Sequence, residues 1–229
     1  MRPAAILLAL TIATSSAAAE KKPLHVVDHV GLGCADLDRG VAVVEERTSV
    51  RAETGGVHPG RGTHNALMTL GHGTYLEIIA PVAGGAATPD NAELAALATP
   101  KPVFFAVGST DLAATAALLK AAGFATSEIR AGSRKKPDGS VLEWRTLRLE
   151  GKDLGAAPFF IEWTKGAAHP SATSPKGCTL AKLEVESESP ERLSRLFEVL
   201  GLDVPVRKAA APGLRVRMVC PNGEVSFGP

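Results

Sequence analysis

The stretch HPGRGTHNALMTLGHGTYLEIIAP, His58–Pro81, predicts two adjacent strands, at 63–70 and 74–79, joined by a turn at Gly71-His72-Gly73. An acid, Glu77, stands at the centre of the second strand. Burying an unpaired carboxylate costs several kcal/mol. A half-buried strand that carries an acid therefore predicts a partner for it, and the rest of the sequence shows which partners are available.

Composition and charge favour an ordinary globular protein. Of the 229 residues, 45% are hydrophobic and 21% are charged, which is enough for a sizeable core. The formal net charge of +1 gives no electrostatic reason to expect nucleic acid or an anionic membrane as a partner.

The first residues have the three-part form of a secretory signal peptide. Arg2 precedes an apolar run at 4–12, and small residues lead up to Ala19, where cleavage is expected. We therefore expect residues 1–19 to be a signal peptide and the mature protein to be periplasmic or secreted, with no membrane contact after cleavage. The alternative is a buried or membrane-anchoring N-terminal helix.

The three cysteines, Cys34, Cys178 and Cys220, are too widely spaced for a thiolate metal motif. In an exported protein two of them can pair and leave one free. The alternative is that they are small buried residues.

A β-α-β-β-β pattern recurs along the chain, which is an architectural signal. In each copy a strand is followed by an acidic or serine-containing turn and then by a helix. The opening strands are expected at 25–33, 103–109 and 178–187. We expect an α+β fold in which two tandem units form one domain with a cupped mixed sheet, followed by a third unit of the same kind. The expected ranges are 24–81 and 101–165 for the first two units, 24–170 for their domain and 177–229 for the C-terminal unit.

One acid or imidazole stands on each of three expected strands, on the face that a covering helix does not need. These residues are His29, Glu77 and Glu162. Carboxylate oxygens and imidazole nitrogens suit Zn, Ni, Mn or Fe, so a shared divalent metal ion would satisfy all three groups. The alternatives are an arginine partner for Glu77, a hydrogen-bonded core histidine at His29 and a solvated edge position for Glu162.

Three motifs, VDHVGLGCADLDRG, HPGRGTHNALMTLGHGTYLEIIAP and PFFIEW, resemble the glyoxalase-like domain group of the vicinal oxygen chelate superfamily. In that superfamily two such units close a cupped sheet around a divalent metal ion held by residues of both units. By position the resemblance implies three metal ligands, His29, Glu77 and Glu162. The remaining ligand position falls on Phe104, which cannot bind a metal.

Polar residues near Glu77 are candidates for contact with a substrate. Arg61 can clamp a carboxylate or a phosphate, and the alternative is a solvated arginine in a glycine-rich turn. His64 can replace the missing ligand or act as a catalytic base. Asn65, on the face opposite His64, and Tyr75, on the face of Glu77, complete the predicted substrate-binding set.

The other polar motifs are expected at the surface. His58, His72 and His169 lie in Gly- or Pro-containing contexts typical of loops, and the basic run Arg134-Lys135-Lys136 predicts a solvated hairpin.

Three functions remain open. The resemblance implies a metal-dependent lyase or isomerase that acts on a small molecule with vicinal oxygens, with the metal as Lewis acid and Glu162 as both ligand and catalytic base. An extradiol-type dioxygenase would need His64 as a further ligand. The second function is metal-free binding or sequestration of a small molecule, which Phe104 and export favour. The third is an interaction module whose C-terminal unit mediates assembly, for example as a homodimer.

Overall fold

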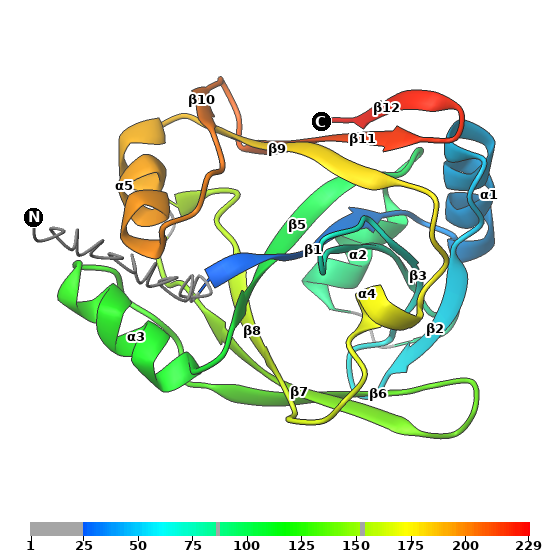
Figure 1. The fold of residues 1–229 in the computed structure, drawn as a ribbon, viewed down its shortest axis with the longest axis horizontal. Coiled ribbons are helices and arrows are strands. Elements are labelled where there is room, and N and C mark those ends of the chain that lie inside the picture. Colours follow the sequence, from blue (N-terminus) through cyan, green and yellow to red (C-terminus); the bar gives the residue numbers. More distant parts are fainter. Residues whose placement is uncertain (1–24, 86–87, 152–153) are drawn as a thin grey trace, which may run out of the picture.

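The computed structural model describes residues 25–85, 88–151 and 154–229 (Figure 1). The predicted signal peptide, 1–19, lies outside these ranges. Within them no helix is long and apolar enough to cross a membrane.

The described elements comprise helices, barrel strands and C-terminal strands. The helices are α1 (Leu37–Thr48), α2 (Pro89–Ala95), α3 (Leu112–Ala121), α4 (Pro170–Thr173) and α5 (Pro190–Leu200). The barrel strands are β1 (His25–Gly33), β2 (Glu53–His58), β3 (Thr63–Thr69), β4 (Tyr75–Pro81), β5 (Lys101–Ser109), β6 (Arg130–Lys135), β7 (Val141–Arg148) and β8 (Phe159–Trp163). The C-terminal strands are β9 (Thr179–Ser187), β10 (Val206–Lys208), β11 (Gly213–Cys220) and β12 (Gly223–Phe227).

The first eight strands close into a barrel in the order β1-β4-β3-β2-β6-β7-β8-β5. The two units meet on one side where β1 pairs antiparallel with β5, and on the other where Val57 of β2 pairs with Lys135 of β6. Within each unit the first and last strands are parallel neighbours, β1 with β4 and β5 with β8. The predicted tandem βαβββ fold is confirmed, and the cup of its mixed sheet is closed all round.

Alternation of side chains gives the barrel an apolar outer face and a polar, aromatic inner face. On β4 the outward residues Leu76 and Ile78 are fully buried in the main core, together with Val44 of α1. The helix begins after Asp36, whose side chain accepts a hydrogen bond from the backbone N–H of Arg39 at 2.8 Å. The inward residues of the same strands are the ones that build the candidate site.

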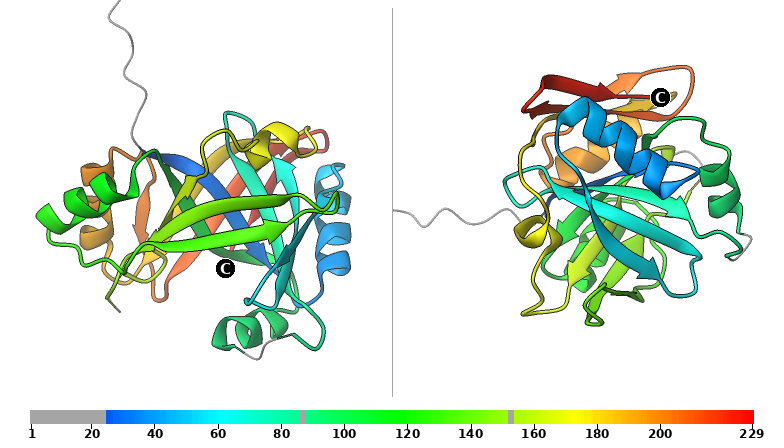
Figure 2. Two further views of the ribbon diagram at one scale, coloured as in Figure 1. Left: turned by 90° about the horizontal axis from the view of Figure 1, so that it is seen from below. Right: turned by 90° about the vertical axis from the view of Figure 1, so that its right-hand side faces the viewer.

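The C-terminal residues form a separate four-stranded sheet, in the order β10-β9-β11-β12, which lies against one side of the barrel next to α1 (Figure 2). This sheet and α5 complete a third strand-helix-three-strand unit, as predicted. Its Val185 and Met218 share the main core with Phe105 of β5, and Phe105 meets Phe197 of α5 with ring centroids 6.1 Å apart. The third unit therefore covers the outer side of the junction between the first two.

Two of the barrel strands, β2 and β6, carry no alternating apolar pattern and were not predicted. In β2, Gly55 and Gly56 let the chain approach β6 closely, since a Cβ at Gly55 would lie 2.0 Å from Nη1 of Arg134. Arg134 is itself only 5% exposed. The prediction that this residue belongs to a solvated hairpin is therefore wrong, because its side chain turns into the barrel.

A disulfide joins Cys178, just before β9, to Cys220 at the end of β11, and Cys34 is a buried free thiol. Burial, together with the negative charge of Asp36, raises the pKa of the Cys34 thiol to about 11. One of the two alternatives for the cysteines, pairing of two with the third left free, is the one observed.

We expect thiol titration to count one cysteine in the unfolded, non-reduced protein and three after reduction. In the native protein Cys34 should react slowly with an alkylating reagent, because it is buried and mostly protonated. The Cys178→Ser/Cys220→Ser variant should lose about 2–4 kcal/mol of unfolding free energy in urea titrations. Three thiols without reductant would contradict the pairing.

Candidate functional site

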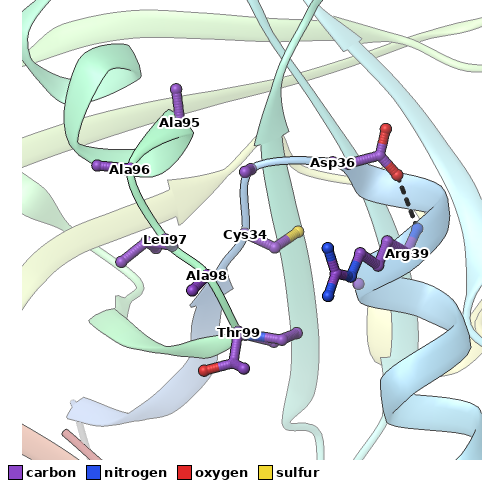
Figure 3. Close-up of a pocket in the computed structure, with 11 residues that line it drawn as sticks. Cys34, Asp36, Arg39, Ala95, Ala96, Leu97, Ala98 and Thr99 are labelled. Carbon is purple, nitrogen blue, oxygen red and sulfur yellow. Dashed lines mark hydrogen bonds between the residues drawn. The ribbon is translucent and has the colours of Figure 1, made fainter.

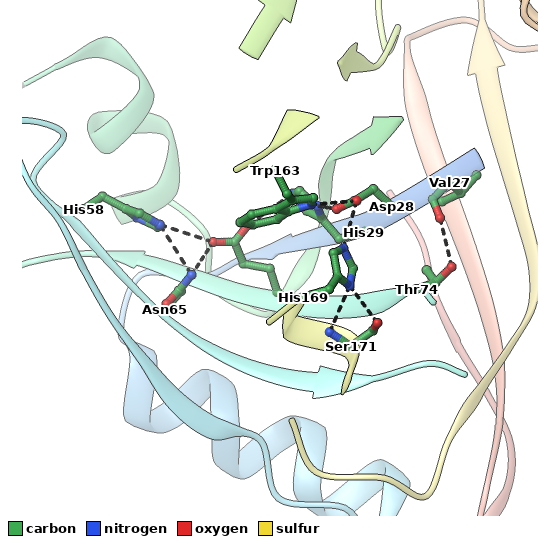
Figure 4. Close-up of polar contacts among 10 residues, drawn as sticks. Val27, Asp28, His29, His58, Asn65, Thr74, Trp163, His169 and Ser171 are labelled. Atoms are coloured by element: carbon green, nitrogen blue, oxygen red, sulfur yellow. Dashed lines mark hydrogen bonds and ion pairs between the residues drawn. The ribbon is translucent and has the colours of Figure 1, made fainter. Parts of the chain in front are cut away.

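The carboxylate of Glu77 is buried inside the barrel between two imidazoles, those of His29 and His58. Figure 4 shows these two histidines, with Asn65 beside His58. Oε2 of Glu77 lies 3.6 Å from Nε2 of His29 on β1, and Oε1 lies 3.7 Å from Nε2 of His58 on β2. Asn65 of β3 donates a hydrogen bond from Nδ2 to Oε1 of Glu77 at 2.5 Å. Four neighbouring strands, β1, β4, β3 and β2, thus bring these groups together.

Asp28 holds the imidazole of His29 from its other side. Nδ1 of His29 lies 2.6 Å from Oδ1 of Asp28, while Oδ2 of Asp28 accepts hydrogen bonds from Nε1 of Trp163 and from Nε2 of His169, both at 3.0 Å. Burial alone would raise the pKa of Asp28, but the hydrogen bonds and positive charges of His169 and His29 hold that pKa well below its usual range.

A β-bulge explains how two consecutive residues, Asp28 and His29, both reach this network. The register of β1 against β5 shifts between Val27 and His29, so the regular alternation is broken at Asp28. Regular alternation places Asp28 on the face opposite His29, and for that reason the sequence pattern did not single it out.

His58 and Arg134 extend the network across the barrel. Burial lowers the pKa of His58, and the negative charge of Glu77 opposes that effect. Arg134 donates from Nη1 to Oδ1 of Asn65 at 3.0 Å, which orients the amide so that its N–H group faces Glu77. Burial also lowers the pKa of Arg134, again against the charge of Glu77.

His169 reaches Asp28 from the segment that connects β8 to β9. It caps α4, and Nδ1 lies 2.7 Å from Oγ of Ser171. Its ring meets Tyr75 and Trp163 edge-on, with centroids 5.6 Å and 5.3 Å apart. The predictions that His58 and His169 are loop-surface residues are wrong, because both are held inside this network. His72, by contrast, lies in the turn before β4 with a φ of 48°.

Aromatic rings surround His29. Tyr75 stacks on it with centroids 4.6 Å apart, and Phe104 and Phe159 meet it edge-on at 5.9 Å and 5.6 Å. Burial raises the pKa of Tyr75 well above its usual value, and the charges of Asp28 and Glu77 add to the effect, so the phenol stays protonated. The ring of Phe104 also covers Gly31, where a Cβ would lie 2.3 Å from it.

Glu162 lies outside this network, so its expected convergence with His29 and Glu77 is not found. Its Oε2 accepts a hydrogen bond from the backbone N–H of Leu112 at 2.9 Å, at the start of α3, and Oε1 pairs with Arg145. The alternation of β8 is as expected, but the inner face belongs to Phe159, Ile161 and Trp163. Those three large apolar side chains take the inner face, which leaves Glu162 on the outer one.

Of the remaining predicted site residues, some lie in the network around Glu77 and the others lie outside it. Asn65 and Tyr75 lie beside Glu77 and His29, as the contacts above show. His64 alternates with Asn65 and therefore points to the outer face of β3, away from the Glu77 carboxylate. Arg61 is exposed in the turn between β2 and β3, where its carbonyl accepts a hydrogen bond from Asn91 at 2.9 Å.

The donor set around Glu77 suits a divalent metal in its chemistry but not in its arrangement. His29 and His58 face different oxygens of the carboxylate, and Asn65 already donates to one of them. In the described ranges no group of three or more His, Cys, Asp or Glu residues is arranged to hold a metal ion. We therefore derive no chemical step through a metal.

A surface pocket of about 240 Å³ lies apart from this network, between the start of α1 and the segment that follows α2 (Figure 3). Small apolar side chains form most of its wall, and the carboxylate of Asp36 is engaged as the helix cap. The pocket therefore offers less chemistry than the barrel interior.

We expect the Asp28→Asn variant to lose about 1–3 kcal/mol of unfolding free energy at pH 7, because two imidazoles lose a charged acceptor. A carboxylate with a lowered pKa in the folded protein stabilises it above the unfolded-state pKa of about 3.9, and this contribution is lost as the pH falls. Urea titrations should therefore show the difference from wild type shrinking below about pH 4. The exposed Asp203→Asn variant is the control, and a difference independent of pH would contradict the pairing.

Comparison with known proteins agrees with the fold. The sequence matches the glyoxalase-like domain family over residues 27–201. No curated protein matches the chain in sequence. Among solved structures, a hypothetical protein from Staphylococcus aureus is similar with a TM-score of 0.62 and 16% identity, over 89% of this chain and 85% of that one.

Two methylmalonyl-CoA epimerase structures are similar over less of the chain. The enzyme from Mycobacterium tuberculosis has a TM-score of 0.47 and 19% identity, over 64% of this chain and 94% of that one. An epimerase in complex with methylmalonyl-CoA and NH4+ has a TM-score of 0.48 and 22% identity, over 65% and 99%. From the family match, which spans most of the described barrel and α5, the chain belongs to the glyoxalase-like domain family.

Proposed function

We propose that this protein is an enzyme of isomerase or lyase type that moves a proton next to a carbonyl group of a small molecule with vicinal oxygens. The observation that carries the proposal is the facing pair of Glu77 and His29. Within the described residues, Oε2 of Glu77 and Nε2 of His29 make no hydrogen bond, although they lie 3.6 Å apart and are buried. Two unengaged groups of this kind are suited to acid–base work.

In the proposed step the Glu77 carboxylate removes the proton. The C–H bond next to the carbonyl breaks, the proton goes to Oε2 of Glu77, and the electron pair moves onto the carbonyl oxygen. His29, bonded to Asp28 through Nδ1, presents Nε2 to that oxygen. Return of the proton to another carbon gives an isomer, and expulsion of a leaving group gives the product of a lyase.

Neighbouring groups hold this pair in place. Arg134 orients Asn65, and Asn65 donates to the other oxygen of Glu77, which leaves Oε2 as the reactive one. Asp28 is in turn held by Trp163 and His169, so the imidazole of His29 has one preferred orientation.

The alternative is binding of a small molecule without turnover. It is favoured by the aromatic rings of Tyr75, Phe104 and Phe159, which are suited to holding a flat ligand against His29. The two functions differ in a single outcome: only the enzyme exchanges a carbon-bound proton with solvent.

We expect wild-type protein to catalyse exchange of the proton next to a carbonyl in D2O for a member of a panel of 2-hydroxy ketones, 2-oxo aldehydes and 2-oxo acids. Proton NMR detects this as loss of one signal. Glu77→Gln should lower the rate by about 10²–10⁴-fold, which is the usual contribution of a general base. Retained exchange in that variant would rule out Glu77 as the base.

Glu162→Gln is the matched control, because Glu162 is an acid of the same kind on the outer face of the barrel. This variant should keep the wild-type exchange rate. Loss of exchange would indicate that Glu162 takes part in catalysis. Elemental analysis of the same samples tests the divalent-metal dependence implied by the family. About one equivalent of Zn, Ni, Mn or Fe in wild type, absent from Glu77→Gln, would support a metal at this position.

We also propose that the protein is exported and works in the periplasm or outside the cell. The Cys178–Cys220 disulfide supports this localisation, since disulfides persist in oxidising compartments. A homodimer also stays a prediction.

Intact-mass measurement of the protein from a periplasmic extract should match a chain that begins at Glu20, two hydrogens lighter than its fully reduced form. A chain that begins at Met1 and is found with reduced cysteines in the cytoplasm would contradict export.

A further inference from the structure

Two arginines lie on the inner face of neighbouring strands, at one end of the barrel. On β6 the inner face alternates, so Arg130 shares it with Arg134, which reaches Asn65 inside the barrel. On β7 Arg148 shares the inner face with Trp144. Arg130 pairs with Thr146, and this register makes Arg130 and Arg148 diagonal neighbours on one face.

Arg148 is connected to the Glu77–His29 pair by one aromatic ring. Its Cζ lies 5.1 Å from the centroid of the Phe159 ring. The same ring lies 5.6 Å from the ring of His29, centroid to centroid. Arg148 and the His29 imidazole therefore contact the same aromatic ring, that of Phe159.

Arg61 contributes a third positive charge to this end of the barrel. Burial lowers the pKa of Arg148, and the positive charges of Arg61 and Arg130 lower it further, while Asp90 acts in the opposite direction. The backbone of Arg61 is tied to Asn91, the residue after Asp90, so α2 fixes the turn that carries this arginine.

These three arginines differ from five arginines on the outer surfaces that have acidic partners. The paired ones include Arg51 with Glu45, Arg145 with Glu162, Arg207 with Glu184, Arg215 with Glu186 and Arg217 with Glu224. Across the described ranges, Arg61, Arg130 and Arg148 form no ion pair. Like charges held near one another without an ion-paired carboxylate raise the electrostatic free energy of the protein, and a bound anion lowers that cost.

We propose that Arg61, Arg130 and Arg148 form an anion subsite that binds a carboxylate or phosphate group of the substrate. Guanidinium groups recognise both anions through paired N–H donors. The subsite rests on the proposed function in one respect: it holds the anionic end of the substrate while the carbon that loses its proton lies toward Glu77 and His29. The substrate class is therefore an anionic small molecule with vicinal oxygens.

The test is calorimetric titration of the mature protein with succinate and, separately, with inorganic phosphate, at pH 7 and low salt. We expect wild type to bind at least one of them, and the tighter of the two identifies the preferred anion. Arg130→Gln/Arg148→Gln should weaken that binding about tenfold or more, since it removes two charge-assisted contacts. Arg148→Lys keeps the positive charge but loses the paired N–H donors of the guanidinium. Its anion affinity should lie between those of wild type and the double variant.

The control is Arg215→Gln/Arg217→Gln, which makes the same change in net charge on the C-terminal sheet. It should bind within about twofold of wild type, because a change in net charge alone has little effect at a distant site. Absence of binding to either anion by wild type, or equal weakening in the control, would overturn the subsite.

Failure of the subsite and failure of the proposed function have different signatures. Glu77→Gln should keep anion binding and lose proton exchange. Exchange that survives in Glu77→Gln contradicts the proposed function and leaves anion binding to be judged by the arginine variants. Anion binding that survives in Arg130→Gln/Arg148→Gln contradicts the subsite, whatever the exchange rate.

Discussion

The interior of the barrel depends on the compensation of two buried carboxylates, Asp28 and Glu77. Each is bonded or closely approached by groups from several strands, so neither stands as an isolated charge in an apolar surrounding. This requirement explains why a small barrel devotes so many inward positions to polar groups. It also explains why a connecting segment, with His169, is drawn toward the barrel interior. The described residues show compensation by hydrogen bonds and by the facing imidazoles.

Much of the fold was predictable because it follows from local patterns. The opening strand of each unit, the helix after it and the recurrence of the unit all leave strong signals in apolar spacing and turn residues. Strands β2 and β6 leave no such signal, because glycines and charged residues form them. Their place is determined by the closure of the barrel, which no local window of sequence contains.

The candidate site was predictable only where alternation is regular. His29, Asn65, Tyr75 and Glu77 follow from the period of two along β1, β3 and β4. Alternation also separates Glu162 from its neighbours correctly, but it does not say which side of β8 faces inward. That choice depends on the competition between one acid and three large apolar side chains for the inner face. A bulge in β1 and a long-range contact from His169 lie beyond what alternation can show.

The segment that carries His169 is held at both of its ends. On one side it continues from β8, and on the other it enters the third unit at Cys178, which a disulfide fixes to Cys220 of β11. Backbone hydrogen bonds from Thr69 to Pro175 and from Leu180 to Leu70 fasten the same end to β3. A chain with both ends anchored has few conformations to lose when its middle becomes ordered. The third unit thus anchors one end of the segment that carries the His169 imidazole, so a sheet outside the barrel helps to order the barrel interior.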